Sequence, residues 1–108
     1  MRRIVITGMG TINPLGLNVK EFWENVKQNK CGIDYITHFD TEEFKTKLAA
    51  EVKGFEADQF IDAKEAKRMS RFSQFAVAAA KEAYADSGLA DSGIDTERVG
   101  VFVSTGVG

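Results

Sequence analysis

The sequence of 108 residues is long enough for one ordinary domain, and its composition of 44% hydrophobic and 28% charged residues is typical of a globular protein and excludes a disordered tail. Its 14 Lys and Arg against 16 Asp and Glu give a formal net charge of -2 at pH 7, so the chain as a whole has no positive field to hold nucleic acid or an anionic membrane. The single cysteine excludes an internal disulfide, and no apolar run suits a signal peptide or a membrane span, so we expect a cytoplasmic protein.

Two short apolar runs predict β-strands that are buried on both faces. They are residues 4–7, Ile-Val-Ile-Thr, and residues 99–103, Val-Gly-Val-Phe-Val. Each run needs neighbouring strands beside it and helices above and below it. We therefore expect an α/β fold in which both strands lie inside a sheet.

An amphipathic helix is predicted after the first strand. Four apolar residues recur at the i, i+3, i+4, i+7 spacing of one helix face: Val19, Phe22, Trp23 and Val26. Asn18 precedes them as an N-cap and Glu21 follows as in a capping box, so the helix should begin there and end near Gln28. Residues 13–16, Asn-Pro-Leu-Gly, should form an irregular loop before it.

The second half of the chain predicts two helices in tandem. Residues 63–87 contain no glycine or proline, and Ser70 is a suitable N-cap, so we expect one helix before it and a longer one after it, stopped by Gly88. Residues 75–80 are apolar round most of the helix circumference, which indicates packing on several sides. A largely polar connection, residues 89–98, should follow.

The region 31–62 gives weaker signals, because glycines and acidic residues alternate there with isolated aromatic side chains. We expect short helical turns at residues 40–43 and 58–61 and an extended stretch at residues 48–52. If edge strands also lie in this region, the chain is a small independent α/β domain.

The chain ends on Ser-Thr-Gly-Val-Gly directly after a predicted strand, and open α/β sheets place ligands at such strand ends. The two buried strands and the apolar helix also need more neighbours than the sequence supplies. We therefore expect residues 1–108 to be an incomplete N-terminal part of a larger α/β domain, with no internal domain boundary. The alternative, a small independent domain, would unfold cooperatively when expressed alone.

The glycines at positions 8 and 10 suggest a dinucleotide-binding turn, but the rest of that motif is missing. The motif has a third glycine where this chain has Asn13, and Pro14 prevents a helix from starting smoothly inside it. We expect a plain turn, and a small nucleotide-binding domain is a weakened alternative.

Neither the single cysteine nor the single histidine predicts a reactive site. Cys31 follows a helix end, where the dipole disfavours a thiolate, so we interpret it as a small packing residue. His38 has no second histidine or cysteine at a metal-binding spacing, so no zinc site or catalytic triad can be assembled around it from the sequence. We expect His38 to form hydrogen bonds in a loop.

One cluster of charges has a definite geometry. Lys64, Lys67, Arg68 and Arg71 fall at the i, i+3, i+4, i+7 positions, so a continuous helix would place them on one face. Such a face would attract an acidic partner or a phosphate, and a solvated face without a partner is an equally good interpretation. Because a cap at Ser70 would break the helix before Arg71, we assign the patch to the first three residues.

Eight motifs occur in an order that is more specific than any one of them. They are residues 3–10, Arg-Ile-Val-Ile-Thr-Gly-Met-Gly; 13–16, Asn-Pro-Leu-Gly; Phe22 with Trp23; 31–33, Cys-Gly-Ile; 38–40, His-Phe-Asp; 64–72, Lys-Glu-Ala-Lys-Arg-Met-Ser-Arg-Phe; 86–89, Asp-Ser-Gly-Leu; and 100–108, Gly-Val-Phe-Val-Ser-Thr-Gly-Val-Gly. In this order they resemble the start of the β-ketoacyl-acyl carrier protein synthases, and most of all the synthase II branch of fatty acid synthesis. Polyketide ketosynthases are the alternative.

The resemblance implies a thiolase-like fold with αβαβα layers, of which this chain would be roughly the first quarter, and a homodimer. It implies an enzyme that loads an acyl chain onto a cysteine and condenses it with malonyl-acyl carrier protein, without a further cofactor. The family's nucleophilic cysteine and two histidines match no residue of this chain, and Cys31 and His38 match non-catalytic positions. Residues 1–108 alone are therefore expected to be inactive.

Two sets of site residues follow from the resemblance. Lys64, Lys67 and Arg68 match the basic segment that docks the acidic carrier protein. Val107 matches a turn beside the acyl pocket, in which Gly106 and Gly108 allow a close backbone approach. A non-catalytic module that binds an acidic partner through the same basic helix is the alternative.

Overall fold

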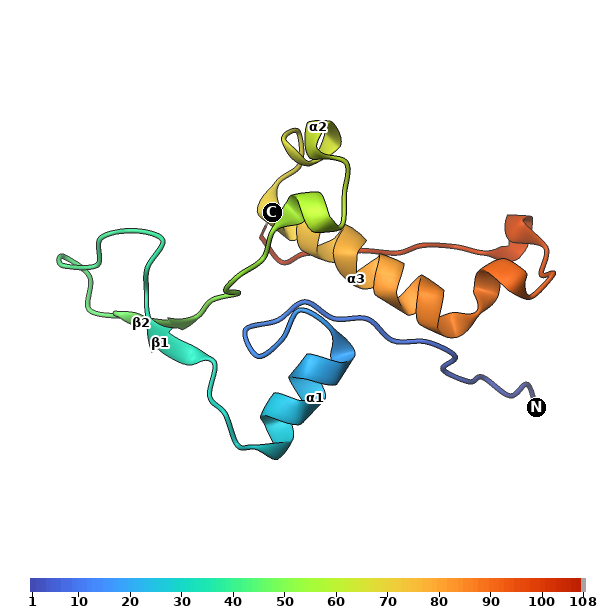
Figure 1. Ribbon diagram of the computed structural model, residues 1–108, viewed down its shortest axis with the longest axis horizontal. Coiled ribbons are helices and arrows are strands. Elements are labelled where there is room, and N and C mark those ends of the chain that lie inside the picture. Colours follow the sequence, from blue (N-terminus) through green and yellow to red (C-terminus); the bar gives the residue numbers. More distant parts are fainter. Residues whose placement is uncertain (108) are drawn as a thin grey trace. The chain divides into compact units, whose positions relative to one another are not determined.

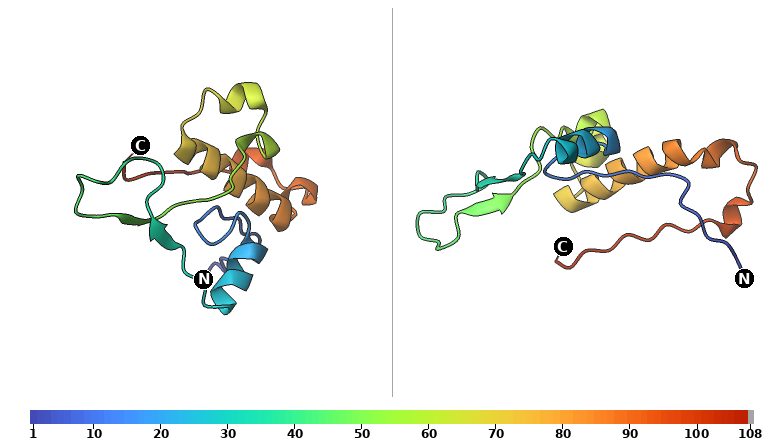
Figure 2. Two further views of the ribbon diagram at one scale, coloured as in Figure 1. Left: turned by 60° about the vertical axis from the view of Figure 1, so that its left-hand side comes forward. Right: turned by 90° about the horizontal axis from the view of Figure 1, so that it is seen from below.

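The computed structural model describes residues 1–107 and contains two compact units. One comprises residues Ile12–Phe55, and the other comprises Met1–Thr11 together with the chain from Glu56 onward. Figure 1 labels the helices and strands of both units, and Figure 2 shows them from two further directions.

The helix of the first unit forms as expected. Helix α1 spans Val19–Lys27, the Asn18 Oδ1 accepts a hydrogen bond from the Glu21 backbone N–H at 2.8 Å, and Gln28 is the C-cap. The expected loop before it is closed by two reciprocal backbone bonds between Asn13 and Gly16, of 2.9 and 3.1 Å. Local capping and turn signals therefore predicted this part correctly.

The same unit contains a β-hairpin, of which the sequence analysis predicted one strand. Strand β1 (Ile33–Tyr35) was not expected, whereas β2 (Leu48–Ala50) lies in the stretch expected to be extended. The two are antiparallel, with Ile33 opposite Ala50 and Tyr35 opposite Leu48.

The start of a short helix expected at residues 40–43 is wrong, because the hairpin connection forms a single turn there, in which the Phe44 N–H donates to the Thr41 carbonyl at 2.9 Å. The Lys47 ammonium donates to three carbonyl oxygens of this connection, those of Thr41, Glu42 and Phe44. The rings of Phe39 and Phe44 meet edge to face with centroids 5.6 Å apart. These contacts fix the connection without a helix.

The second unit contains the two tandem helices that were expected. A short 3-10 helix, η1 (Ala57–Gln59), precedes α2 (Ala63–Ala66), and the longer α3 spans Arg71–Ser87. Ser70 is the N-cap of α3, with φ -67° and ψ 158°, and Gly88 ends it in the left-handed conformation at φ 68°. Two 3-10 turns follow, η2 (Leu89–Asp91) and η3 (Thr96–Arg98).

The two predicted strands are the main error of the sequence analysis. Residues 4–7 and 99–103 run as extended segments that form no strand (Figure 1), and the one sheet described within residues 1–107 is the β1–β2 hairpin. Their side chains are not buried either, since Ile4 is 94% and Phe102 96% exposed. A strand requires a neighbouring backbone to pair with, and the described residues offer none to these segments.

The segment around the two early glycines packs against α3. The backbone N–H groups of Met9 and Thr11 donate to the carboxylates of Asp86 and Glu82, at 3.1 and 3.0 Å. These two acceptors lie one turn apart on the helix. A Cβ atom on either Gly8 or Gly10 would collide with backbone carbonyl oxygens of α3. The glycines therefore permit close helix packing and do not form the turn that was expected.

Candidate functional site

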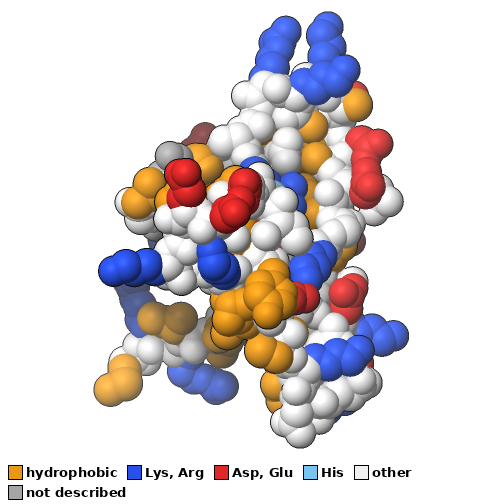
Figure 3. Space-filling view, turned by 90° about the vertical axis from the view of Figure 1, so that its left-hand side faces the viewer, with side chains coloured by type: hydrophobic (Ala, Val, Ile, Leu, Met, Phe, Trp, Pro, Cys, Tyr) orange, Lys and Arg blue, Asp and Glu red, His pale blue; other side chains and the backbone are white. Residues whose placement is uncertain are grey.

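The predicted basic residues lie together on an exposed segment. We define the basic segment as residues 63–69, which comprise α2 and the turn after it. Lys64 lies on α2, Lys67 is its C-cap, and the Arg68 N–H donates to the Glu65 carbonyl at 3.0 Å. All three basic side chains are exposed, and Figure 3 shows Lys and Arg side chains gathered at the upper end of the molecule, over α2.

The helix ends before the full basic face can form. Helix α2 has only four residues, and α3 starts at Arg71, whose guanidinium lies 4.9 Å from the ring centroid of Phe75. The assignment of the patch to Lys64, Lys67 and Arg68, without Arg71, is therefore consistent with the helix boundaries.

Helix α3 holds the chain on both sides of α2. The Gln74 side-chain amide donates to the Ala66 carbonyl at 3.0 Å, and the Lys81 ammonium donates to the Phe60 carbonyl. Three hydrophobic residues are buried in the part of the chain that the structure describes: Ile61, Ala66 and Ala78. Ile61 lies two residues before the basic segment, Ala66 belongs to it, and Ala78 lies on α3 within the apolar run 75–80 that was expected to pack on several sides.

Val107 lies at the end of the described chain. Its side chain is 93% exposed, and its carbonyl accepts a hydrogen bond from the Thr105 hydroxyl at 3.1 Å. An apolar cavity of about 260 Å³ lies in the same unit, lined by α3 residues such as Phe72 and Val77 and by Val101 and Val103, but not by Val107. Gly108, the second glycine of the expected turn, lies outside the described residues.

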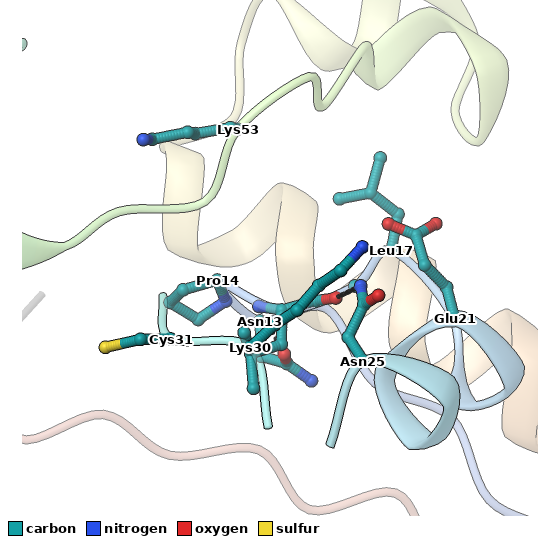
Figure 4. Close-up of a pocket in the computed structure, with 10 residues that line it drawn as sticks. Asn13, Pro14, Leu17, Glu21, Asn25, Lys30, Cys31 and Lys53 are labelled. Atoms are coloured by element: carbon teal, nitrogen blue, oxygen red, sulfur yellow. Dashed lines mark hydrogen bonds between the residues drawn. The ribbon is translucent and has the colours of Figure 1, made fainter. Parts of the chain in front are cut away.

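A second, polar cavity of about 220 Å³ lies within the unit of residues Ile12–Phe55. Figure 4 shows Glu21 and Asn25 of α1 on one side of it and Cys31 with Lys53 on the other. The Asn25 amide donates to the Leu15 carbonyl and so ties α1 to the preceding loop. Cys31 is exposed at the edge of this cavity, which is not the buried packing position that we expected.

Glu51 is a polar centre that the sequence analysis missed. Its side chain is only 8% exposed, and it accepts hydrogen bonds from the Thr37 hydroxyl at 2.9 Å, from the Thr37 N–H at 3.1 Å and from the His38 N–H at 3.4 Å. The His38 imidazole Nε2 lies 3.3 Å from the carboxylate, so the loop hydrogen-bonding role expected for His38 is confirmed. An acidic residue at the end of an apolar extended run was the available signal.

The hydrogen bonds of Glu51 also affect its ionisation. Burial alone would raise the pKa of this carboxyl, but the Thr37 hydroxyl and amide, together with His38, outweigh burial and lower the pKa below its ordinary value of 4.5. The pKa of Asp34 is lowered by the Tyr35 backbone N–H and by Lys53, whose ammonium lies 3.2 Å away. Both carboxylates therefore favour their charged forms.

Two negative findings concern residues 1–107. No group of three or more His, Cys, Asp or Glu side chains within this range is placed to hold a metal ion. Within the same range, no helix has the length and apolar character required to cross a membrane.

The chain is similar to known proteins over its whole length. Residues 1–108 match the family model described as Beta-ketoacyl synthase, N-terminal domain. A Staphylococcus aureus protein named 3-oxoacyl-(acyl-carrier-protein) synthase 2 is 46% identical over 107 residues, which are 99% of this chain and 26% of that protein. A Synechocystis sp. protein of the same name is 40% identical over 107 residues, with the same shares of both chains. This chain thus spans about a quarter of the length of these curated relatives.

Solved structures are similar as well. The structure titled "The ishigamide ketosynthase/chain length factor" matches with a TM-score of 0.73 and 36% identity, over 92% of this chain and 23% of that one. A Beta-ketoacyl synthase from Burkholderia phymatum matches with a TM-score of 0.68 and 31% identity, over 90% of this chain and 24% of that one.

Proposed function

Because this chain belongs to the β-ketoacyl synthase N-terminal domain family, we propose that it forms the N-terminal part of an enzyme that lengthens acyl chains on acyl carrier protein. The observation that carries this proposal is the match of all 108 residues to the family. Identities of 46% and 40% to two proteins named 3-oxoacyl-(acyl-carrier-protein) synthase 2 exceed the 36% identity to the ishigamide ketosynthase, which favours fatty acid elongation over polyketide synthesis.

The α/β, thiolase-like fold class expected from the sequence is confirmed, since both structural neighbours are ketosynthases. Within that class, the strands differ from those expected, because the sheet is the β1–β2 hairpin and residues 4–7 and 99–103 form no strand. The chain contributes helices and a small hairpin to it.

In the proposed reaction, a cysteine thiol first takes an acyl group from its carrier protein and releases the carrier thiol. Malonyl-carrier protein then loses CO₂, and the resulting carbanion attacks the enzyme thioester. A carbon–carbon bond forms while the carbon–sulfur bond breaks, which yields 3-oxoacyl-carrier protein and restores the cysteine. We assign none of these bond-forming groups to residues 1–108.

The reaction can be tested with purified full-length protein, an acyl-carrier protein and malonyl-carrier protein. We expect CO₂ and a 3-oxoacyl product extended by one malonyl-derived unit, as observed by mass spectrometry, and no product from residues 1–108 alone. Repeated condensation without reduction would favour the polyketide alternative, and the absence of any condensation would contradict the proposal.

Within this enzyme, we assign the docking of the acidic carrier protein to Lys64, Lys67 and Arg68. These side chains are exposed on one short segment that contains a single acidic residue, Glu65, although the whole chain has a net charge of -2. A local positive patch of this kind attracts an acidic partner and increases the association rate.

Charge reversal provides the test. We expect the double substitution Lys64→Glu with Arg68→Glu in the full-length protein to weaken carrier-protein affinity about tenfold at low salt, because each lost attraction becomes a repulsion. The difference should shrink as salt is added and the charges are screened. The substitutions Lys20→Glu with Lys45→Glu give the same change in charge outside the segment and serve as the control. Equal affinities of the two double variants would leave the basic segment as a solvated surface.

The remaining expectations concern the whole protein. We propose that the full-length enzyme is a homodimer in the cytoplasm, as in the family that the sequence resembles. Light scattering of the full-length protein would detect a monomer if the first part of this proposal is wrong, and cell fractionation tests the second.

A further inference from the structure

We infer that one face of α3, formed by Gln74, Ala78 and Lys81, positions the basic segment for its partner. The inference rests on the docking role proposed above and adds residues that do not themselves belong to the positive patch. Gln74, Ala78 and Lys81 are spaced at i, i+4 and i+7, so they lie on one side of the helix.

The two side-chain hydrogen bonds of this face both reach the same stretch of chain. Gln74 donates to the carbonyl of Ala66, the last residue of α2, and Lys81 donates to the carbonyl of Phe60, two residues before the N-cap of α2. Ala78, between the two donors on the helix face, is only 2% exposed. Helix α3 therefore binds the chain at two points, before the start of α2 and at its last residue.

Buried hydrophobic side chains lie at or next to the acceptors of these two hydrogen bonds. Ala66 accepts one of them and is 6% exposed, and Ile61 follows the other acceptor and is 5% exposed. Within residues 1–107, these two residues and Ala78 are the buried hydrophobic side chains. Ala78 lies between the two donors in the sequence of α3 and is buried, so a larger side chain at this position would disturb the packing of the helix.

The basic segment depends on these contacts because α2 is too short to hold its own orientation. A helix of four residues is unstable by itself in water and forms only where tertiary contacts support it. Without the two bonds, the three basic side chains would be spread over many directions. A partner would then have to order the segment on binding, at the expense of affinity.

Residues that position the basic segment and residues that carry its charge should differ in how their replacement changes the salt dependence of carrier-protein binding. The patch residues act through long-range attraction, so their effect depends on salt. Gln74 is neutral, so its replacement removes a contact without changing the charge, whereas replacement of Lys81 by an uncharged residue removes a contact and a positive charge together. Loss of the Gln74 contact should therefore weaken binding by a similar factor at every salt concentration.

The test uses full-length variants Gln74→Met and Lys81→Met, which keep the aliphatic length of each side chain but remove the donor. Lys81→Arg, which restores a donor, and Gln28→Met, at an exposed glutamine outside the segment, are the controls. The probe is the acyl carrier protein of Staphylococcus aureus. We expect each donor-free variant to bind about fivefold more weakly, from the loss of one hydrogen bond. The charge-neutral substitution Gln74→Met should leave the salt dependence of binding unchanged. In the donor-free variants, the backbone amides of residues 57–69 should exchange hydrogen faster than in the parent. Their kcat should be unchanged, and their KM for the carrier-protein substrate should be raised. The control Lys81→Arg should bind the carrier protein like the parent.

The outcomes separate this inference from the docking proposal. If the charge-reversed variant loses affinity but Gln74→Met and Lys81→Met exchange and bind like the parent, the positioning role is wrong and the docking role stands. Faster exchange without weaker binding would equally overturn the positioning role. If charge reversal leaves binding unchanged, the docking proposal fails, and any loss of affinity in Gln74→Met must then arise from another surface.

Discussion

At the scale of single residues, Glu51 determines how the chain leaves β1. Its carboxylate accepts hydrogen bonds from the N–H groups of Thr37 and His38 and from the Thr37 hydroxyl. These two residues lie 14 and 13 positions before Glu51 in the sequence. Several hydrogen-bond donors around a carboxylate favour its charged form, and they lower the pKa of Glu51 despite burial. The shape of this connection should therefore depend on pH.

We expect the substitution Glu51→Gln in the full-length protein to lower the melting temperature at neutral pH, because a neutral amide accepts these bonds more weakly. The pKa of Glu51 is lowered on folding, so its contribution is fully present above the ordinary value of 4.5 and is lost as pH falls below that value. The difference between parent and variant should therefore be constant above about pH 4.5 and close as the pH is lowered below that value. Thermal unfolding across this range measures it, with the exposed Glu42→Gln as the control. A difference that stays constant with pH would show that the Glu51 charge has no such role.

Val107 allows a second prediction at this scale. If it borders the acyl pocket, a larger side chain should exclude the longest acyl substrates, since overpacking by a bulky group lowers their reaction rate about tenfold or more. Because Val107 is 93% exposed within residues 1–107, Val107→Trp disturbs no packing in this part of the protein. The measurement is the rate of the full-length variant with acyl groups of increasing length, and Val107→Ile is the conservative control. An unchanged length profile would remove Val107 from the pocket.

At the scale of elements, the parts with local signals were predicted from the sequence. Helix α1 was expected because Asn18 caps it, and the division between α2 and α3 followed from Ser70. The end of α3 followed from Gly88, which adopts the left-handed conformation. Such signals act within one turn of the chain, so the sequence contains them completely.

Elements that depend on distant partners were not predicted. Strand β1 pairs with residues 13 to 17 positions further along, and Lys47 stabilises the connection through backbone carbonyls. The apolar runs at residues 4–7 and 99–103 indicate what each segment requires as neighbours, but not which neighbours are present. An apolar pattern thus predicted strands where the described residues provide no partner strand.

The candidate site divides in the same way. Its charges were predicted, because spacing along the sequence places Lys64, Lys67 and Arg68 together. The roles of Gln74 and Lys81 were not, because both donate to backbone carbonyl oxygens, which every residue possesses. Sequence therefore predicts the chemistry of this surface better than the contacts that orient it.

At the scale of the whole molecule, exposed apolar side chains outnumber buried ones. Ile4, Val101 and Phe102 are 94%, 79% and 96% exposed, while the buried hydrophobic residues described within residues 1–107 are Ile61, Ala66 and Ala78. If Ile4, Val101 and Phe102 were buried, the transfer of these three side chains out of water would contribute about 5–9 kcal/mol to stability. That is comparable with the entire stability of an ordinary domain, about 5–15 kcal/mol.

We therefore expect residues 1–108, expressed alone, to lack cooperative thermal unfolding and to bind a dye that reports exposed apolar surface. Ordering the backbone costs about 1–2 kcal/mol per residue, and so few buried side chains cannot offset that cost. Calorimetry and amide NMR spectra measure the outcome, with the full-length protein as the reference. A sharp calorimetric transition together with dispersed amide signals would instead support a small independent domain, and the extended segments 4–7 and 99–103 would then need partners within these residues.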